Sequence, residues 1–176
     1  KVKNYDFEAN IDYADLHLLN FMKRDSISIF KGNLKFRAKG NTVDDIDGKL
    51  QVANASFQNN KDSYYFEDFE VTSTFDAARV RTVTINSPDI IQGKVVGKYQ
   101  VKQVVDIVEN ALGSLYANYS PNKLKPGQFL DFDFTIYNKI IEIFNPNVSV
   151  AENTVLKVKI NADEGDFKMN FTSPKV

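Results

Sequence analysis

The sequence contains no cysteine and a single histidine, His17. A chain without cysteine forms no disulfide, has no thiolate nucleophile and offers no thiolate ligand to zinc. Such a chain is compatible with an oxidising compartment. His17 has no candidate nucleophile beside it, and a partly buried histidine satisfied by the backbone is the more common role for a residue set among leucines. Histidine-dependent catalysis is therefore poorly supported.

The sequence also lacks an excess of charge of one sign and a long apolar run. Its 22 lysines and arginines balance 23 aspartates and glutamates, so the whole chain has no global attraction for nucleic acid. No run reaches the roughly 18 apolar residues of a membrane-spanning helix. The chain has neither an initiator methionine nor a signal sequence. We therefore expect residues 1–176 to be a single β-rich domain, cut from a longer protein whose membrane anchor lies outside it.

What the sequence does have is period-two alternation of apolar and polar residues. About 43% of its residues are hydrophobic, which is typical of a folded domain. A change of phase near residues 30–32 predicts a β-bulge. Because short polar turns separate the five segments between residues 27 and 99, these are expected to pair as an antiparallel meander. The alternation predicts strands over residues 27–39, 46–57, 65–75, 81–85, 91–99, 130–136, 156–160 and 167–171.

Residues 100–119 interrupt this alternation. Their apolar residues are spaced three and four apart, as in an amphipathic helix, although Gly113 weakens the helix locally. Residues 14–22 fit either a short helix or an irregular connector. The fold class that follows is mainly β: a strongly curved, groove-like antiparallel sheet with one amphipathic α-helix around 100–119 packed on its concave side.

Candidate catalytic and metal-binding motifs are weak. Gly93–Tyr99 is one residue too short for a phosphate loop, and its alternation fits a strand rather than the start of a helix. The cluster of Asp44, Asp45 and Asp47 departs from a calcium loop at both ends. Asp131 and Asp133 share one strand face and would suit an acid–base pair, but polar residues are also what a water-facing strand requires. We predict no catalytic residue, no metal site and no cofactor, and treat a hydrolase or sugar-modifying activity as the weakest alternative.

The apolar strand positions remain as the candidate site. Apolar faces on about eight strands must be covered by a closed core or left as a trough, and soluble monomers rarely expose apolar patches of that size. The same positions fit an ordinary core equally well. The candidate lining residues of an apolar groove are Leu34, Phe36, Leu50, Val52, Phe69, Val71, Val83, Ile85 and Val95.

Several of these stretches resemble the repeat of the AsmA/TamB superfamily. In that repeat a strand ending in glycine leads to a strand with an Asn-Ala pair, an aromatic-rich strand and a strand with two glycines. The stretch from Gly127 to Asn138, continuing at Lys159–Glu164, is similar to TamB homologues of Bacteroidetes-type bacteria. The four repeat-like stretches read FKGNLKFRAKG (30–40), IDGKLQVANASF (46–57), YYFEDFEV (64–71) and IQGKVVGKY (91–99).

The resemblance implies a periplasmic protein anchored in the inner membrane, whose strands curl into a β-taco with an apolar lining. It implies a role in outer-membrane biogenesis, through phospholipid transport between the membranes or through outer-membrane protein assembly with a BamA-like partner. The expected partners are thus phospholipid acyl chains or apolar protein segments, with no nucleic acid. The resemblance transfers no catalytic residue. The alternative function is a scaffold that binds proteins by strand-edge pairing and carries no lipid.

Overall fold

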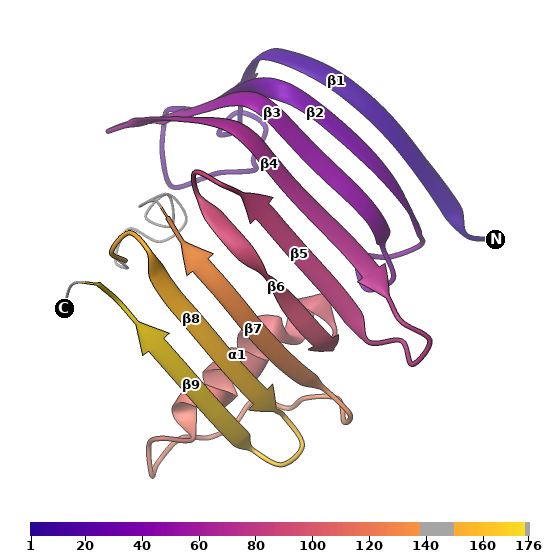
Figure 1. The fold of residues 1–176 in the computed structure, drawn as a ribbon, viewed down its shortest axis with the longest axis vertical. Coiled ribbons are helices and arrows are strands. Elements are labelled where there is room, and N and C mark those ends of the chain that lie inside the picture. The colour runs from indigo at the N-terminus through magenta and orange to yellow at the C-terminus, as the bar shows by residue number, and fades with distance from the viewer. Residues whose placement is uncertain (138–149, 175–176) are drawn as a thin grey trace.

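The computed structural model describes residues 1–137 and 150–174, which form a mainly β structure around one antiparallel sheet (Figure 1). Asn138, the last residue of one TamB-like stretch, lies outside the described residues. The nine strands are β1 (Lys3–Asp15), β2 (Ser28–Gly40), β3 (Asp47–Asn59), β4 (Ser63–Phe75), β5 (Arg81–Ser87), β6 (Ile91–Lys98), β7 (Phe129–Ile136), β8 (Thr154–Asn161) and β9 (Asp166–Thr172).

Each strand pairs antiparallel with the next one along the chain, so the order in the sheet is β1 to β9 without a crossover. The predicted meander is confirmed, and a further strand, Lys3–Asp15, precedes those predicted. Asn59 and Asp76 organise two of the turns by accepting hydrogen bonds from backbone N–H groups of the residues that follow. Among the described residues β1 pairs only with β2 and β9 only with β8, so the sheet is not closed into a barrel.

The predicted bulge lies between β2 and β3, where the register shifts between Lys31 and Asn33. Gly32 adopts a φ of +151°, and a Cβ there would lie 2.8 Å from the Cβ of Ala55. On the partner strand Asn54 adopts a φ of +50°, a left-handed conformation that asparagine tolerates better than most residues. The Asn-Ala pair of the TamB-like stretch therefore occupies a bulge that requires glycine opposite it.

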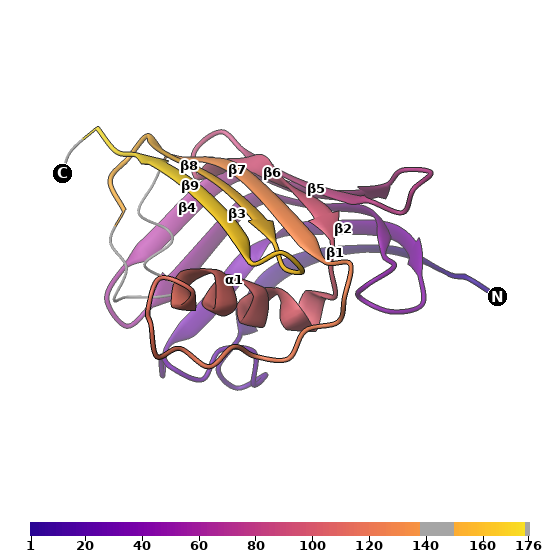
Figure 2. The same ribbon diagram turned by 90° about the horizontal axis from the view of Figure 1, so that it is seen from below.

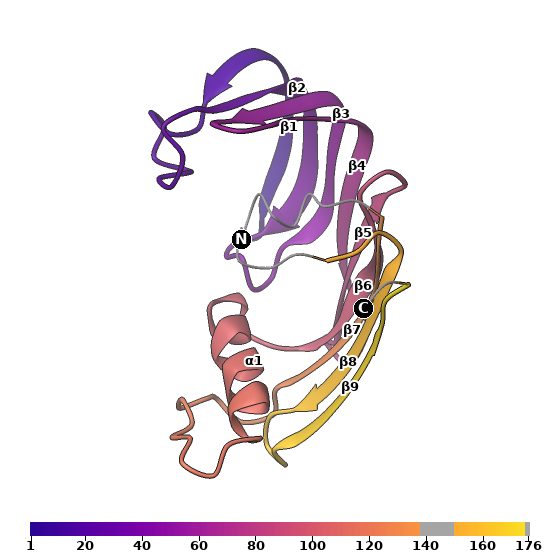
Figure 3. The ribbon, with the colours of Figure 1, turned by 90° about the vertical axis from the view of Figure 1, so that its left-hand side faces the viewer.

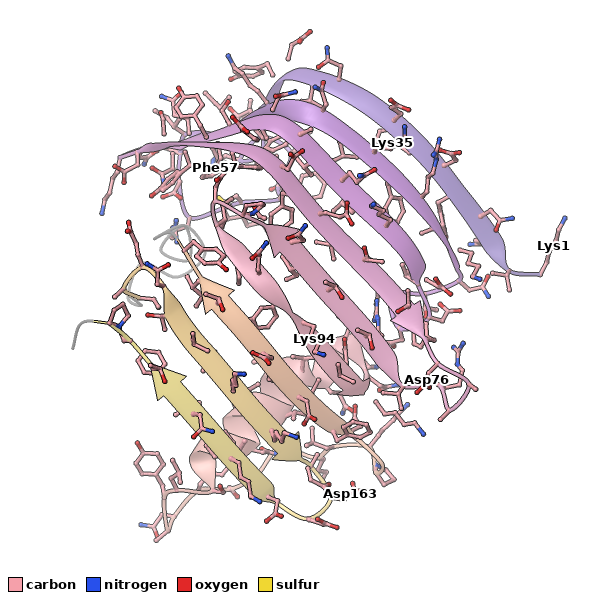
Figure 4. All side chains as sticks on the ribbon, in the orientation of Figure 1. Lys1, Lys35, Phe57, Asp76, Lys94 and Asp163 are labelled. Atoms are coloured by element: carbon pink, nitrogen blue, oxygen red, sulfur yellow. The ribbon has the colours of Figure 1, made fainter. Side chains whose placement is uncertain are left out.

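The two faces of the sheet differ in chemistry, as the alternation predicts. Ion pairs between neighbouring strands, such as Arg37–Asp6 and Lys49–Glu70, lie on one face. Lys35 and Lys94, labelled in Figure 4, project from this polar face. The opposite face carries the apolar residues and the helix, and we call it the helix-bearing face.

The helix α1 (Val104–Gly113) follows the 3₁₀ turn η1 (Val101–Gln103) and lies on the helix-bearing face near β6–β9 (Figures 2 and 3). Its buried residues Ile107 and Ala111 are one turn apart and pack with residues of β7 and β8. The buried core between the helix and the sheet consists of Ile107, Ala111, Leu130, Val158 and Ile160.

The prediction of a helix over residues 100–119 is wrong in its bounds, because the α-helix occupies only 104–113. Beyond Gly113 the chain folds back, so that the ring of Tyr119 lies where a Cβ on Gly113 would be, at 2.4 Å. The Tyr119 hydroxyl donates to Asn110 Oδ1 at 2.9 Å, and the Asn122 N–H donates to the same oxygen at 2.7 Å. These contacts replace the last turns of the expected helix.

The connection between β1 and β2 is irregular, which settles the alternative left open for residues 14–22. β1 continues to Asp15, and its carboxylate then accepts hydrogen bonds from the N–H groups of His17 and Leu18. This pattern forms a turn rather than a helix. Within the described part of the chain no helix has both the length and the apolar character needed to cross a membrane.

Candidate functional site

One apolar row crosses all nine strands of the helix-bearing face. The pairing registers place one residue of each strand opposite its neighbour, without interruption, from β1 to β9. Eight of the nine residues in this row are large and apolar, and Gly93 of β6 is the exception. In strand order the row is Phe7, Phe36, Leu50, Val71, Ile85, Gly93, Phe134, Leu156 and Phe171.

Two further rows run beside it on the same face. One joins Ala9, Leu34, Val52 and Phe69 across the first four strands. The other crosses the whole sheet and contains its smallest residues in β2–β4. In strand order it is Tyr5, Ala38, Gly48, Ser73, Val83, Val95, Phe132, Val158 and Met169.

All nine sequence-predicted lining residues therefore lie on one face. Leu34, Val52 and Phe69 belong to the short row, Val83 and Val95 to the third row, and Phe36, Leu50, Val71 and Ile85 to the first. Only Val52 is buried, and the other eight are half-buried. Whether they line a groove for a ligand stays a prediction.

The helix covers only the C-terminal part of this face. The described residues that pack beneath α1 come from β6 to β9 and the loops beside the helix, and none comes from β1 to β5. At the two edges of the sheet the rows end in exposed residues. Phe7 is 53% and Phe171 is 56% exposed. Among the described residues helix α1 covers this apolar face over one end only, and soluble monomers rarely expose apolar patches of such extent.

A cavity of about 640 Å³ opens between α1, the segment that follows it and the β8–β9 hairpin. The buried residues Ile107, Ala111 and Ile160 form part of its wall, while Asp163 and Asp166 lie at the hairpin. Its volume falls in the range of small-molecule sites, about 300–1,000 Å³. The alternation could not predict this cavity, because it depends on how the chain returns after Gly113.

Arg81 is the one charged side chain that is buried within the described residues, and it lies on the helix-bearing face. Its Nε donates to Ser73 Oγ at 2.8 Å and its Nη1 donates to the Val43 carbonyl at 3.0 Å. Its guanidinium carbon lies 5.9 Å from the ring centre of Tyr99. Burial raises the pKa of the Tyr99 phenol, and the positive charge of Arg81 opposes that shift. Arg81 thus ties the 41–46 loop to the sheet.

Replacing Arg81 by methionine is expected to lower the free energy of unfolding by about 2–3 kcal/mol, because Ser73 and the Val43 carbonyl lose a charged donor. Urea unfolding followed by circular dichroism measures the change. Arg81→Lys keeps the charge but loses the guanidinium geometry that donates to Ser73 and the Val43 carbonyl at once. An intermediate loss of stability is therefore expected. A methionine variant as stable as the parent would show that desolvation of the guanidinium offsets its hydrogen bonds.

The acidic residues of the sequence motifs lie in structural contacts. Asp131 and Asp133 reach Lys159 and Lys157, at 3.7 and 3.3 Å, on the polar face. Asp45 accepts hydrogen bonds from the backbone N–H groups of Thr42 and Asn41, which lower its pKa. No three acidic or histidine side chains gather as a metal site in the part of the chain that the structure describes.

Among the described residues, the side chains of His17 and Asp44 make no hydrogen bond with the carboxylates of Asp131 and Asp133. Nδ1 of His17 is buried without a hydrogen-bond partner, and Oδ1 of Asp44 accepts the Val101 N–H at 2.7 Å. Gly93–Tyr99 lies largely in β6, where its glycines let neighbouring strands approach closely. Asp44 and the glycines of Gly93–Tyr99 therefore have structural contacts, whereas the expectation that the backbone satisfies His17 is wrong for its Nδ1.

The sequence-based list of lining residues missed the members of the rows in β1 and in β7–β9. The same alternation marked them, because Phe134, Leu156 and Phe171 recur at every second position of their strands. Comparison with known proteins adds no assignment, since no family model, no curated protein and no solved structure matches the chain.

Proposed function

We propose that this chain is a non-enzymatic module that shields phospholipid acyl chains on its helix-bearing face while they cross the cell envelope. The observation that carries the proposal is the apolar row that crosses nine strands and is only half-buried over β2–β5. Burial of apolar surface gains roughly 25 cal/mol per Å², so acyl chains need no specific polar contact to stay bound. In this proposal the sheet acts as a strongly curved, taco-like trough.

The resemblance to the TamB repeat suggests where such a module works. It supports a periplasmic location, an inner-membrane anchor elsewhere in the protein and a role in outer-membrane biogenesis. The cargo is then phospholipid, or an apolar segment of an outer-membrane protein delivered to a BamA-like partner. The role needs no cofactor and no catalytic group, because shielding an apolar chain breaks no bond.

Native mass spectrometry of the purified chain, followed by lipid extraction, tests the proposal. We expect phospholipid adducts on the parent and their loss in a Phe69→Asp/Val71→Asp variant, because both side chains lie on the helix-bearing face. Thr72→Asp, on the opposite face of the same strand, is the matched control and should keep the adducts. Circular dichroism verifies that each variant is folded, and Val71→Ser replaces the double variant if that one unfolds.

A parent chain that carries no phospholipid would contradict the lipid proposal and favour the second candidate, a protein-binding scaffold. The observation behind that candidate is the pair of open edges, above all the 13-residue strand β1. An edge of this length offers a row of backbone donors and acceptors to an added strand. Adducts that survive Phe69→Asp/Val71→Asp but not Thr72→Asp would place the lipid on the polar face and contradict both candidates.

A further inference from the structure

Three exposed apolar side chains project from the connection between β1 and β2. Leu18, Leu19 and Phe21 are 75%, 55% and 80% exposed, and we call them the loop tip. The turn that presents them is fixed from within, since the N–H groups of Phe21 and Met22 both donate to the Leu16 carbonyl. The loop tip is thus a formed projection that leaves its largest side chains in water.

A second exposed apolar group lies at α1. Because Ile107 and Ala111 face the sheet, Val105 and Leu112 face away from it, and Leu115 and Tyr116 extend the group beyond the helix end. We call this group the helix flank. Its members Val105, Leu112, Leu115 and Tyr116 are 65%, 43%, 69% and 73% exposed.

The loop tip and the helix flank lie on the same side of the sheet, one toward each end. Figure 3 shows the 16–27 connection and α1 projecting from the same face, and Figure 2 agrees from a perpendicular direction. The two groups therefore stand on either side of the apolar rows of β2–β5, which α1, the one α-helix of the described residues, does not cover.

Basic residues flank both groups. Lys23 and Arg24 follow the loop tip, Lys102 precedes the helix flank, and Lys123 and Lys125 follow it. Residues 16–27 and 101–125 together contain five basic and three acidic residues, whereas the whole chain has a net charge of −1. Long basic side chains beside exposed leucine and aromatic residues are the composition of segments that lie at a membrane surface.

We propose that the loop tip and the helix flank insert together into the headgroup layer of a phospholipid bilayer. The leucine, phenylalanine and tyrosine side chains would enter the layer, and the flanking lysines would meet its phosphates. A bilayer suits two separate projections better than a folded protein partner does, because one broad deformable surface receives both at once. The insertion turns the apolar rows of β2–β5 toward the membrane.

Flotation with unilamellar vesicles of phosphatidylcholine and phosphatidylglycerol tests the inference on the intact chain. The parent should float with the vesicles, and Phe21→Asp and Leu115→Asp should each lower its partition coefficient by about tenfold, since each puts a charge where an apolar side chain enters the layer. Tyr65→Asp is the matched control, because Tyr65 is 78% exposed on β4, outside both groups, and should float as the parent does.

Three results would overturn the inference: a parent that does not float, insertion variants that float as well as the parent, or an equal loss in Tyr65→Asp. A parent that forms a dimer lost in Phe21→Asp or Leu115→Asp would also overturn it, by showing that a second copy covers these groups. Light scattering coupled to gel filtration measures this.

Membrane contact and acyl-chain shielding separate experimentally. The inference does not need the proposed function, so Phe69→Asp/Val71→Asp should still float with vesicles after losing its lipid adducts. Phe21→Asp should keep any adducts loaded during expression. If the parent floats but never carries lipid, only the proposed function fails; if it carries lipid but does not float, only the inference fails.

Discussion

Replacing Leu130 by alanine is expected to lower the free energy of unfolding by about 3–5 kcal/mol, the range found for large-to-small changes at fully buried positions. Leu130 is completely buried and lies in β7 at the centre of the cluster beneath α1. Its loss removes apolar contacts and leaves a cavity between helix and sheet that the surrounding residues close only in part. Urea unfolding measured by circular dichroism gives the change.

Val105→Ala is the matched control for Leu130→Ala. Val105 is on the outer flank of α1 and is 65% exposed, so its truncation should change stability by less than about 0.5 kcal/mol. Ile107→Ala, on the buried flank, should behave like Leu130→Ala, and the two losses should not add because both residues belong to the same buried cluster. A loss below about 1 kcal/mol for Leu130→Ala would show that α1 does not hold the sheet.

Most of the fold could be predicted because strand alternation and turn chemistry are local signals. Each strand alternates on its own, and the polar turns from β2 to β6 leave too little chain for a parallel crossover. The bulge was also readable, since the apolar phase changes where Gly32 stands. The first strand, β1, was not predicted, although Tyr5, Phe7 and Ala9 follow the same period-two alternation.

The end of the helix could not be predicted from its periodicity. Leu115, Tyr116 and Tyr119 continue the three–four spacing, but in the structure they lie beyond the helix and the first two are exposed. What ends the helix is a tertiary contact, the return of Tyr119 onto Gly113 and Asn110. The sequence shows a glycine at position 113, but its periodicity does not predict that Tyr119 packs against that glycine.

The sequence could predict which face of the sheet carries the candidate site, but not which segments pack over that face. Period two assigns Leu34, Leu50 and Val71 to one side of the sheet, and the registers place them there. It gives no information on what lies above that side, because coverage depends on the length and path of connections. Arg81 has the same parity as Val83 and Ile85, so its place on the apolar face was readable, while its two hydrogen-bond partners were not.

Gly93 is the one gap in the apolar row, and the backbone explains it. A Cβ there would lie 2.1 Å from the Asp133 carbonyl oxygen and 2.5 Å from Cδ1 of Phe134. Its φ of +153° is also one that other residues rarely adopt. Phe134 fills the space above the glycine, so the row stays apolar across β6 without a side chain from β6 itself.

Gly93→Ala is therefore expected to destabilise the chain by about 2–4 kcal/mol, since a clash with backbone cannot be relieved by a change of rotamer. Lys94→Ala, on the polar face of the same strand, should cost less than about 0.5 kcal/mol. The double variant Gly93→Ala/Phe134→Ala separates the two contacts. If the Asp133 carbonyl dominates, truncating Phe134 restores nothing; recovery of stability in the double variant would instead show that the ring alone requires the glycine.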